Sequence, residues 1–159
     1  MQPEMAFGTG SSRFEEWLSS AGLDLGVRRF PEGTRTAEDA ARAVGCEVGQ
    51  IVKSLLFTAG DRPVMALVSG ANRLNPARLS EAAGGEVGKA RAELVRAATG
   101  YAIGGVPPFG HASELPVFMD ADLRRHAVLW AAAGRPDAVF PISPDRLVEL
   151  SGARVVELK

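Results

Sequence analysis

The chain has 159 residues with a formal net charge of −1, and 46% of its residues are hydrophobic while 23% are charged. This length suffices for one domain with a substantial core, and the charge excludes a uniformly basic nucleic-acid-binding protein while leaving room for a local basic patch. Cys46 is the single cysteine, which excludes a disulfide framework. The sequence shows neither a signal peptide nor a run of about 18 apolar residues, and we therefore expect a cytoplasmic protein.

The first two thirds of the chain predict helices with clear start and stop residues and one β-hairpin. After a flexible segment over residues 1–10, Ser11 or Ser12 can begin a helix that Gly22 ends. Thr36 and Asp39 have the spacing of a capping box. The predicted elements are a helix over 11–22, a strand over 23–30, a helix over 36–45, a hairpin of strands over 51–58 and 64–69, and helices over 75–84 and 91–100.

From residue 101 on, the pattern changes to short strands separated by glycine, proline and polar turns. Strands are predicted over 101–105, 115–120, 127–133, 138–142 and 153–158, with one capped helix over 143–152. Short strands in succession predict an α+β fold: a curved, mainly antiparallel mixed sheet, barrel-like and flanked by helices, in a single domain over 1–159. A doubly wound parallel sheet fits this pattern less well.

Lys53 lies within the apolar run "QIVKSLLF" (50–57), and in a strand it shares a face with Ile51, Leu55 and Phe57. The chain has fifteen arginines and only three lysines, so a lysine at this position points to chemistry that a compact ammonium group performs better than a guanidinium. Two interpretations are open. Lys53 is either an edge-strand lysine that reaches solvent, or a cation at the floor of a pocket, aimed at a phosphate or a polarised carbonyl.

The loop "GYAIGGVPPFGH" (100–111) is the second candidate. Gly104 and Gly105 leave backbone N–H groups open to a ligand, and Pro107 and Pro108 stiffen the loop, which would keep a backbone oxyanion or carboxyl site preorganised. A rigid turn between strands is the alternative. The loop matches neither a P-loop nor a dinucleotide-binding pattern.

Three further residues, Cys46, Asp122 and His126, give weaker indications of a nucleophile or a metal site. Cys46 could act as a nucleophile with His111 or His126, but a single cysteine beside a helix end is more often a small buried residue. Asp122 and His126 have the i, i+4 spacing of a metal face, although Asp120 capping a short helix with His126 at its other end explains the same residues. We therefore expect no metal site.

The lysine strand and the glycine loop, followed by "LPVFMDADL", "AAAGRPDAVFPISPDRLVEL" and "GARVVEL", resemble the YbaK/ProX-like family. Its members are free-standing relatives of the editing domain inserted in bacterial prolyl-tRNA synthetases. The resemblance runs from about residue 23 to the end. It implies hydrolysis, without metal or cofactor, of the ester that joins a wrong amino acid to a tRNA, usually the proline tRNA. The acceptor end of a mischarged tRNA is then the expected partner, and a prolyl-tRNA synthetase is a further candidate partner.

The resemblance also implies roles for individual residues. The family lysine falls on Lys53 and the Gly-x-x-x-Pro loop falls on Gly104 and Pro108, with Gly105 beside it. Lys53, Gly104 and Gly105 are the expected catalytic residues: Lys53 fixes the phosphate or ribose of the terminal adenosine, and the loop backbone stabilises charge on the ester carbonyl while water attacks. The expected substrate-binding residues are Phe30, Pro108, Gly110 and His111, of which His111 is either a general base or a loop residue bonded to backbone.

Two other functions stay open on the sequence. The same pocket could bind an aminoacyl or nucleotide end without hydrolysis and regulate a synthetase or another partner, or it could hydrolyse small esters that are not attached to tRNA. A deacylase predicts that Lys53 and the loop from Gly104 to Pro108 line one cavity.

Overall fold

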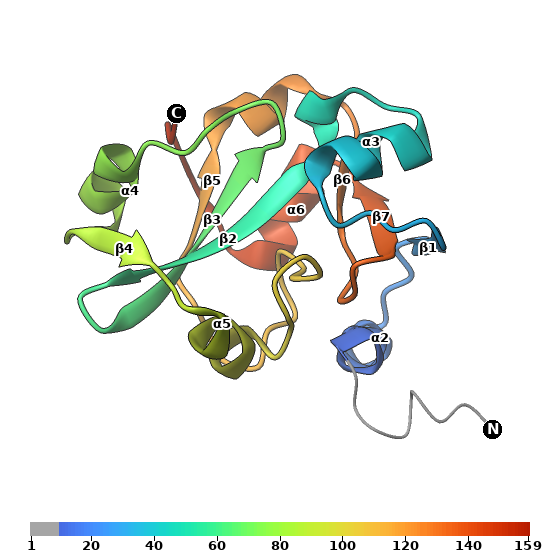
Figure 1. The fold of residues 1–159 in the computed structure, drawn as a ribbon, viewed down its shortest axis with the longest axis horizontal. Helices are drawn as coiled ribbons and strands as arrows, with labels where there is room; N and C mark the ends of the chain where they lie inside the picture. Colours follow the sequence, from blue (N-terminus) through green and yellow to red (C-terminus); the bar gives the residue numbers. More distant parts are fainter. Residues whose placement is uncertain (1–9) are drawn as a thin grey trace.

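The computed structural model describes residues 10–159, in which five α-helices surround two β-sheets (Figure 1). The expected flexible segment over 1–10 lies outside the described residues, except Gly10, which begins α2. The helices are α2 (Gly10–Ala21), α3 (Ala37–Val44), α4 (Pro76–Ala83), α5 (Ala92–Thr99) and α6 (Pro144–Ser151), with short 3-10 helices η1 (Val48–Gln50) and η2 (Ala121–Arg125). No helix in this range is both long and apolar enough to cross a membrane.

The larger sheet has the strand order β4-β2-β3-β5-β8, and the smaller has the order β1-β7-β6. The predicted hairpin is confirmed as the antiparallel pair β2–β3, whereas β5 and β8 run parallel to their neighbours. The strands are β1 (Arg28–Arg29), β2 (Val52–Ala59), β3 (Arg62–Ser69), β4 (Val87–Lys89), β5 (Val117–Asp120), β6 (Leu129–Ala132), β7 (Ala138–Ile142) and β8 (Arg154–Val156).

The α+β class is confirmed, but the expected barrel-like sheet is wrong, because the two sheets do not close. In the described part of the chain, the two sheets are joined by one bridge, between Ile51, just before β2, and Trp130 of β6. The outer edge of β2 is divided: β6 meets it at Ile51, and β4 pairs with it only at residues 57–59. The sheets therefore fork along β2 instead of forming a continuous wall.

Alternating residues of β2 enter different cores. Val52 and Leu56 belong to the main core, which also contains Phe14 of α2 and the aromatic residues of the 100–111 loop. Phe57 packs in a second core with Leu79 of α4. The strand is thus held on both faces, and its outer edge is left free where neither β4 nor β6 pairs with it.

Helix boundaries follow the predicted caps closely. Thr36 accepts a hydrogen bond from the Asp39 N–H at 3.0 Å, and the Asn75 and Ser143 side chains accept equivalent bonds at the starts of α4 and α6. Asp120 stands at the cap position of η2, but its carboxylate is bonded elsewhere, to the Leu158 N–H at 2.7 Å. That role for Asp120 was therefore predicted wrongly, because a partner 38 residues away leaves no local signal.

Two predicted strands are wrong or too long. The segment 101–105 is a turn, because Gly104 takes a left-handed φ of +95° and the Gly105 N–H donates to the Ala102 carbonyl. The strand over 23–30 is reduced to β1, since Gly26 is left-handed and its N–H is bonded to the Asp24 carboxylate. The short strand β4 was not predicted.

Candidate functional site

A cavity of about 400 Å³ opens at the outer edge of β2, in the gap of the fork. It is enclosed by β2, by Val95 of α5, by the first half of the 100–111 loop and by the segment before α3. Its lining residues are Arg35, Thr36, Ala37, Lys53, Ser54, Leu55, Leu56, Phe57, Lys89, Ala90, Val95, Ile103, Gly104 and Val106.

The backbone of β2 contributes to this cavity. The Ile51 carbonyl accepts from Gly70 on the β3 side, whereas the Leu56 carbonyl accepts from Ala90 on the β4 side. Because these directions alternate along an antiparallel strand, the N–H and carbonyl of Ser54 point to the outer edge. Ser54 lies opposite Leu67 of β3 on its inner side, but no strand among the described residues pairs with its outer side. The cavity therefore has an open strand edge as one of its walls.

Lys53 lines this cavity and is half-buried. Its ammonium Nζ donates to the backbone carbonyl of Asn72 at 2.6 Å. Burial lowers the pKa of Lys53 below its usual value, the nearby Arg73 lowers it further, and Glu38 acts in the opposite direction. Partial burial makes the ammonium a stronger partner for an anion than a solvated surface lysine would be.

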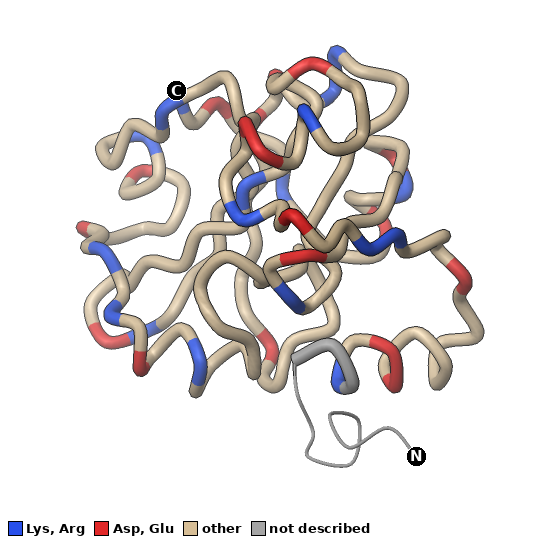
Figure 2. The backbone as a smooth tube through the Cα atoms, turned by 45° about the vertical axis from the view of Figure 1, so that its right-hand side comes forward, with Lys and Arg blue, Asp and Glu red and all other residues tan. Residues whose placement is uncertain are grey.

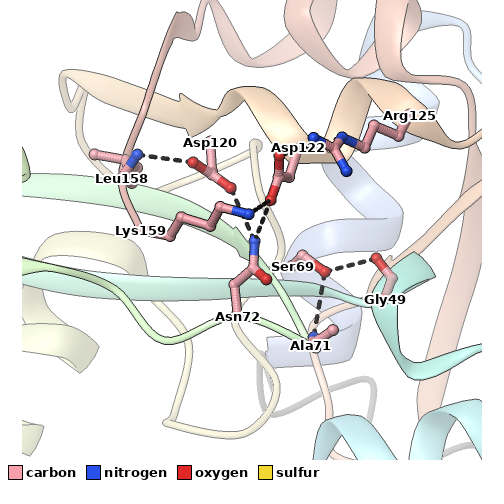
Figure 3. Close-up of polar contacts among 9 residues, drawn as sticks. All are labelled: Gly49, Ser69, Ala71, Asn72, Asp120, Asp122, Arg125, Leu158 and Lys159. Atoms are coloured by element: carbon pink, nitrogen blue, oxygen red, sulfur yellow. Dashed lines mark hydrogen bonds and ion pairs between the residues drawn. The ribbon is translucent and has the colours of Figure 1, made fainter.

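The acceptor of this bond is itself held in place (Figure 3). The Asn72 side-chain amide Nδ2 donates to Asp120 at 3.1 Å and to Asp122 at 2.9 Å, so the turn after β3 is tied to the end of β5 and the start of η2. The ammonium of Lys159 lies 2.7 Å from the same Asp122 oxygen. These four residues, called the Asn72 clamp below, are Asn72, Asp120, Asp122 and Lys159.

Sequence reasoning missed this clamp, and it interpreted Asp122 as one residue of a possible metal face. The Asp122 carboxylate instead accepts hydrogen bonds from Lys159 and Asn72, which lower its pKa. Within residues 10–159, no group of three or more His, Cys, Asp or Glu side chains is placed to hold a metal ion. No local pattern could have revealed the clamp, because Asn72 lies 48 residues from Asp120.

The two glycines of the loop have different surroundings. Gly104 lines the cavity, and a side chain there would come within 3.0 Å of Arg35. Gly105 is buried behind it: its N–H is bonded to Ala102, and a Cβ would lie 2.8 Å from the backbone of Arg135. In the described part of the chain, no acceptor is bonded to the N–H of Gly104 or Val106.

The second half of the loop turns away from Lys53. Pro108, Gly110 and His111 line a different hollow of about 670 Å³, beside Trp17 of α2. His111 donates through Nε2 to the Pro107 carbonyl at 2.6 Å, and burial lowers its pKa. The reversal follows from Phe109, whose buried ring lies 5.2 Å from that of Trp17 and 5.9 Å from that of Phe14.

The structure thus brings together Lys53 and Gly104, two of the seven residues singled out from the sequence. Phe30 is half-buried against the cluster under α3 that contains Ile51 and Trp130, and it does not line the cavity. The cavity adds residues that sequence reasoning did not select: two further cations, Lys89 and Arg35, and Ser54, whose buried hydroxyl has no hydrogen-bond partner among the described residues. Among residues 10–159, no carboxylate lines the cavity.

Comparison with known proteins places this geometry in context. Residues 31–150 match the family model of the aminoacyl-tRNA editing domain. The chain is 27% identical over 152 residues to the uncharacterised protein YwhH of Bacillus subtilis, which covers 95% of this chain and 94% of that protein. It is 36% identical over 106 residues to the proline–tRNA ligase of Maridesulfovibrio salexigens, which covers 66% of this chain but only 18% of the ligase.

Solved structures agree in fold over almost the whole chain. A structure described as a candidate trans-editing enzyme for prolyl-tRNA synthetase has a TM-score of 0.89 and 46% identity, covering 94% of this chain and 96% of that one. A second structure, of a scaffold protein used for the presentation of grafted epitopes, has a TM-score of 0.88 and 42% identity, covering 94% and 96% of the two chains.

Proposed function

The chain belongs to the aminoacyl-tRNA editing domain family, the YbaK/ProX-like relatives of the prolyl-tRNA synthetase editing domain, and we propose that it hydrolyses the ester of mischarged aminoacyl-tRNA in trans, with a non-cognate amino acid on proline tRNA as the substrate. The observation that carries this proposal is the shared cavity of Lys53 and Gly104. It supplies an ammonium group and backbone donors in one enclosed space.

Lys53 and the loop have complementary roles in the proposed reaction. The Nζ of Lys53 carries three protons, and one of them is used by Asn72, so two remain for a phosphate or ribose oxygen of the terminal adenosine. The N–H groups of Gly104 and Val106 are the candidate donors to the ester carbonyl. Gly105 shapes the turn that presents them, because its own N–H holds the loop to Ala102.

The chemistry demands little beyond this arrangement. An aminoacyl ester is already reactive, so a positioned water molecule can attack it without a strong side-chain nucleophile. Charge that develops on the carbonyl oxygen is stabilised by preorganised backbone donors, and one such donor is worth about 10²–10³ in rate. The buried, rigid second half of the loop, anchored by the Tyr101 hydroxyl bond to the Gly110 carbonyl at 2.7 Å, supports that preorganisation.

The test is deacylation of proline tRNA charged with alanine, cysteine, serine or threonine by the wild type, Lys53→Ala and Lys53→Arg. We expect turnover of at least one substrate and a loss of at least about 100-fold in both variants, because a guanidinium cannot place a compact charge at the same point. Arg62→Ala, which removes an exposed cation at the far end of the hairpin, is the matched control and should retain full activity.

The alternatives give different results in the same assay. Binding of tRNA without turnover of any substrate would replace the deacylase by a binding module. Hydrolysis of small aminoacyl esters without turnover of aminoacyl-tRNA would indicate an esterase that does not act on tRNA. Full activity in Lys53→Ala would show that the cavity is not the active site.

A further inference from the structure

The Asn72 clamp is connected to the cavity through one hydrogen bond, from the ammonium of Lys53 to the Asn72 carbonyl. None of its four members lines the cavity: Asn72 lies on the turn after β3, Asp120 and Asp122 lie at the β5–η2 junction, and Lys159 follows β8. The other three converge on Asn72, whose backbone carbonyl is the hydrogen-bond acceptor of Lys53. The clamp therefore fixes the point to which a flexible four-carbon side chain is directed.

We propose that Asn72 is a positioning residue for Lys53, held by Asp120 and Asp122 and supported by Lys159, and that it directs the two unused protons of the ammonium into the cavity. Only the kinetic part of this inference rests on the deacylase activity proposed above. Its structural part concerns the order of one side chain and can be measured without any substrate.

The bond lengths support a stiff arrangement. The Lys53 bond is short at 2.6 Å, the two bonds from the Asn72 amide are 2.9 and 3.1 Å, and Asp120 is almost completely buried. Both amide protons of Asn72 are thus bonded to carboxylates. Hydrogen bonds to charged groups are stronger than hydrogen bonds between neutral groups. A lysine side chain loses much rotamer freedom when its end is held, so preparing that order before the substrate binds favours the bound state.

Asn72→Ala leaves the backbone carbonyl in the chain but removes the bonds that hold it. The expected result is that the Lys53 ammonium becomes mobile and that kcat/KM falls about tenfold to hundredfold, since a misplacement of about 1 Å can have an effect of that size. Lys159→Ala should act in the same direction with a smaller effect, because it removes only the support of Asp122.

A matched control residue lies in the same segment between β3 and α4. Asn75 is three residues from Asn72 and its side chain also holds backbone, accepting from the Ala77 N–H at 3.0 Å to cap α4, but within residues 10–159 it has no hydrogen bond to Lys53. Asn75→Ala should lower stability, as the loss of a cap does, without changing the mobility of Lys53 or kcat/KM of the folded protein.

The experiment combines an NMR readout with a double-mutant cycle. In protein labelled with ¹⁵N-lysine, which has only three lysine signals, the Lys53 signal is assigned through Lys53→Arg, and its Nζ order parameter is compared between wild type, Asn72→Ala and Asn75→Ala. We expect high order in the wild type and in Asn75→Ala, and low order in Asn72→Ala. Unchanged order in folded Asn72→Ala would overturn the proposal.

The kinetic cycle then separates positioning from a general structural effect. If Asn72 acts through Lys53, Asn72→Ala has less than about a twofold effect in a Lys53→Ala background, because the group that it positions is already absent. An equal loss in both backgrounds would overturn the positioning role. If the wild type hydrolyses no aminoacyl-tRNA, the proposed function fails, while the order of the Lys53 ammonium still decides whether the clamp positions it.

Discussion

At the scale of single residues, His111 shows how one ring can contact two parts of the same loop. Its Nε2 donates to the Pro107 carbonyl four residues earlier, and its ring lies at an edge of Tyr101, 6.4 Å between centroids. It lines a different hollow from Lys53. This bond agrees with the interpretation of His111 as a loop residue bonded to backbone, its role toward the substrate stays a prediction, and we assign it no proton transfer in the proposed reaction.

His111 predicts a pH dependence of stability. Burial lowers its folded pKa below the ordinary value of 6.5, so the unfolded chain binds a proton first as the pH falls. The free energy of unfolding should thus decrease from about pH 6.5 downward. Urea unfolding of wild type and His111→Gln at about pH 7.5 and about pH 5.5 measures this, and the variant should show the smaller decrease.

The difference between the two proteins isolates the histidine, because all other titrating groups are common to both and cancel. Gln keeps a donor for the Pro107 carbonyl, so the loop retains its bond. An equal decrease in both proteins would contradict a lowered pKa of His111.

At the scale of elements, the 100–111 loop behaves as two units joined at the buried prolines. Ile103, Gly104 and Val106 face the cavity, while Phe109 is packed among the aromatic rings of α2. The close approach of Gly105 to the Arg135 backbone ties the first unit to the β6–β7 turn. The loop is thus fixed from two sides, by α2 and by the smaller sheet.

Gly105→Ala should disturb the loop although it leaves Lys53 in place. A Cβ at this position would lie 2.8 Å from backbone, which cannot yield as a flexible side chain does. We expect a loss of about 1–3 kcal/mol in the free energy of unfolding, measured by urea denaturation, and reduced deacylation. Gly85→Ala is the control: no atom lies within 4 Å of its Cβ, so stability should be almost unchanged. A neutral Gly105→Ala would show that the turn can move.

The elements also show what a sequence can and cannot predict. Caps such as Thr36, Asn75 and Ser143 act within four residues, so the helices were located almost to the residue. The strand predicted at 101–105 failed because the left-handed Gly104 reverses the chain. Lys53 and Gly104 could be selected as candidate site residues from short-range features, namely a charged residue in an apolar run and a pair of adjacent glycines. The fork of β2 and the Asn72 clamp depend on partners far apart in sequence, and short-range patterns carry no information on them.

At the scale of the whole molecule, charges of both signs are spread over the backbone, as Figure 2 shows, and the net charge is −1. Attraction to the proposed tRNA substrate would therefore come from a few placed cations and not from a general field. The cavity supplies Lys53, Lys89 and Arg35 with no carboxylate among its lining residues. This arrangement suits the single-stranded end of a tRNA better than a long stretch of duplex.

We accordingly expect a shallow salt dependence of tRNA binding. Each phosphate neutralised on a single strand contributes about 0.7 to the slope of log K against log salt, so three cations give a slope of roughly −2 between about 50 and about 200 mM salt. Lys89→Ala should reduce the magnitude by about 0.7 and Arg62→Ala should not change it. A slope steeper than about −5 would show that the protein contacts duplex phosphates outside the cavity.

The fork of β2 has a consequence for how such a pocket can diversify. The cavity lies where the two sheets diverge along β2, and it is not a void within a packed core. Ile103 stands at the margin of the cavity, and because it is 62% exposed it contributes little to the packing of the core. Substitutions at such margin positions can enlarge, narrow or reshape the cavity at a small cost in stability. The pocket can thus change its preference among substrate side chains while the Lys53 ammonium and the turn at Gly104 stay the same.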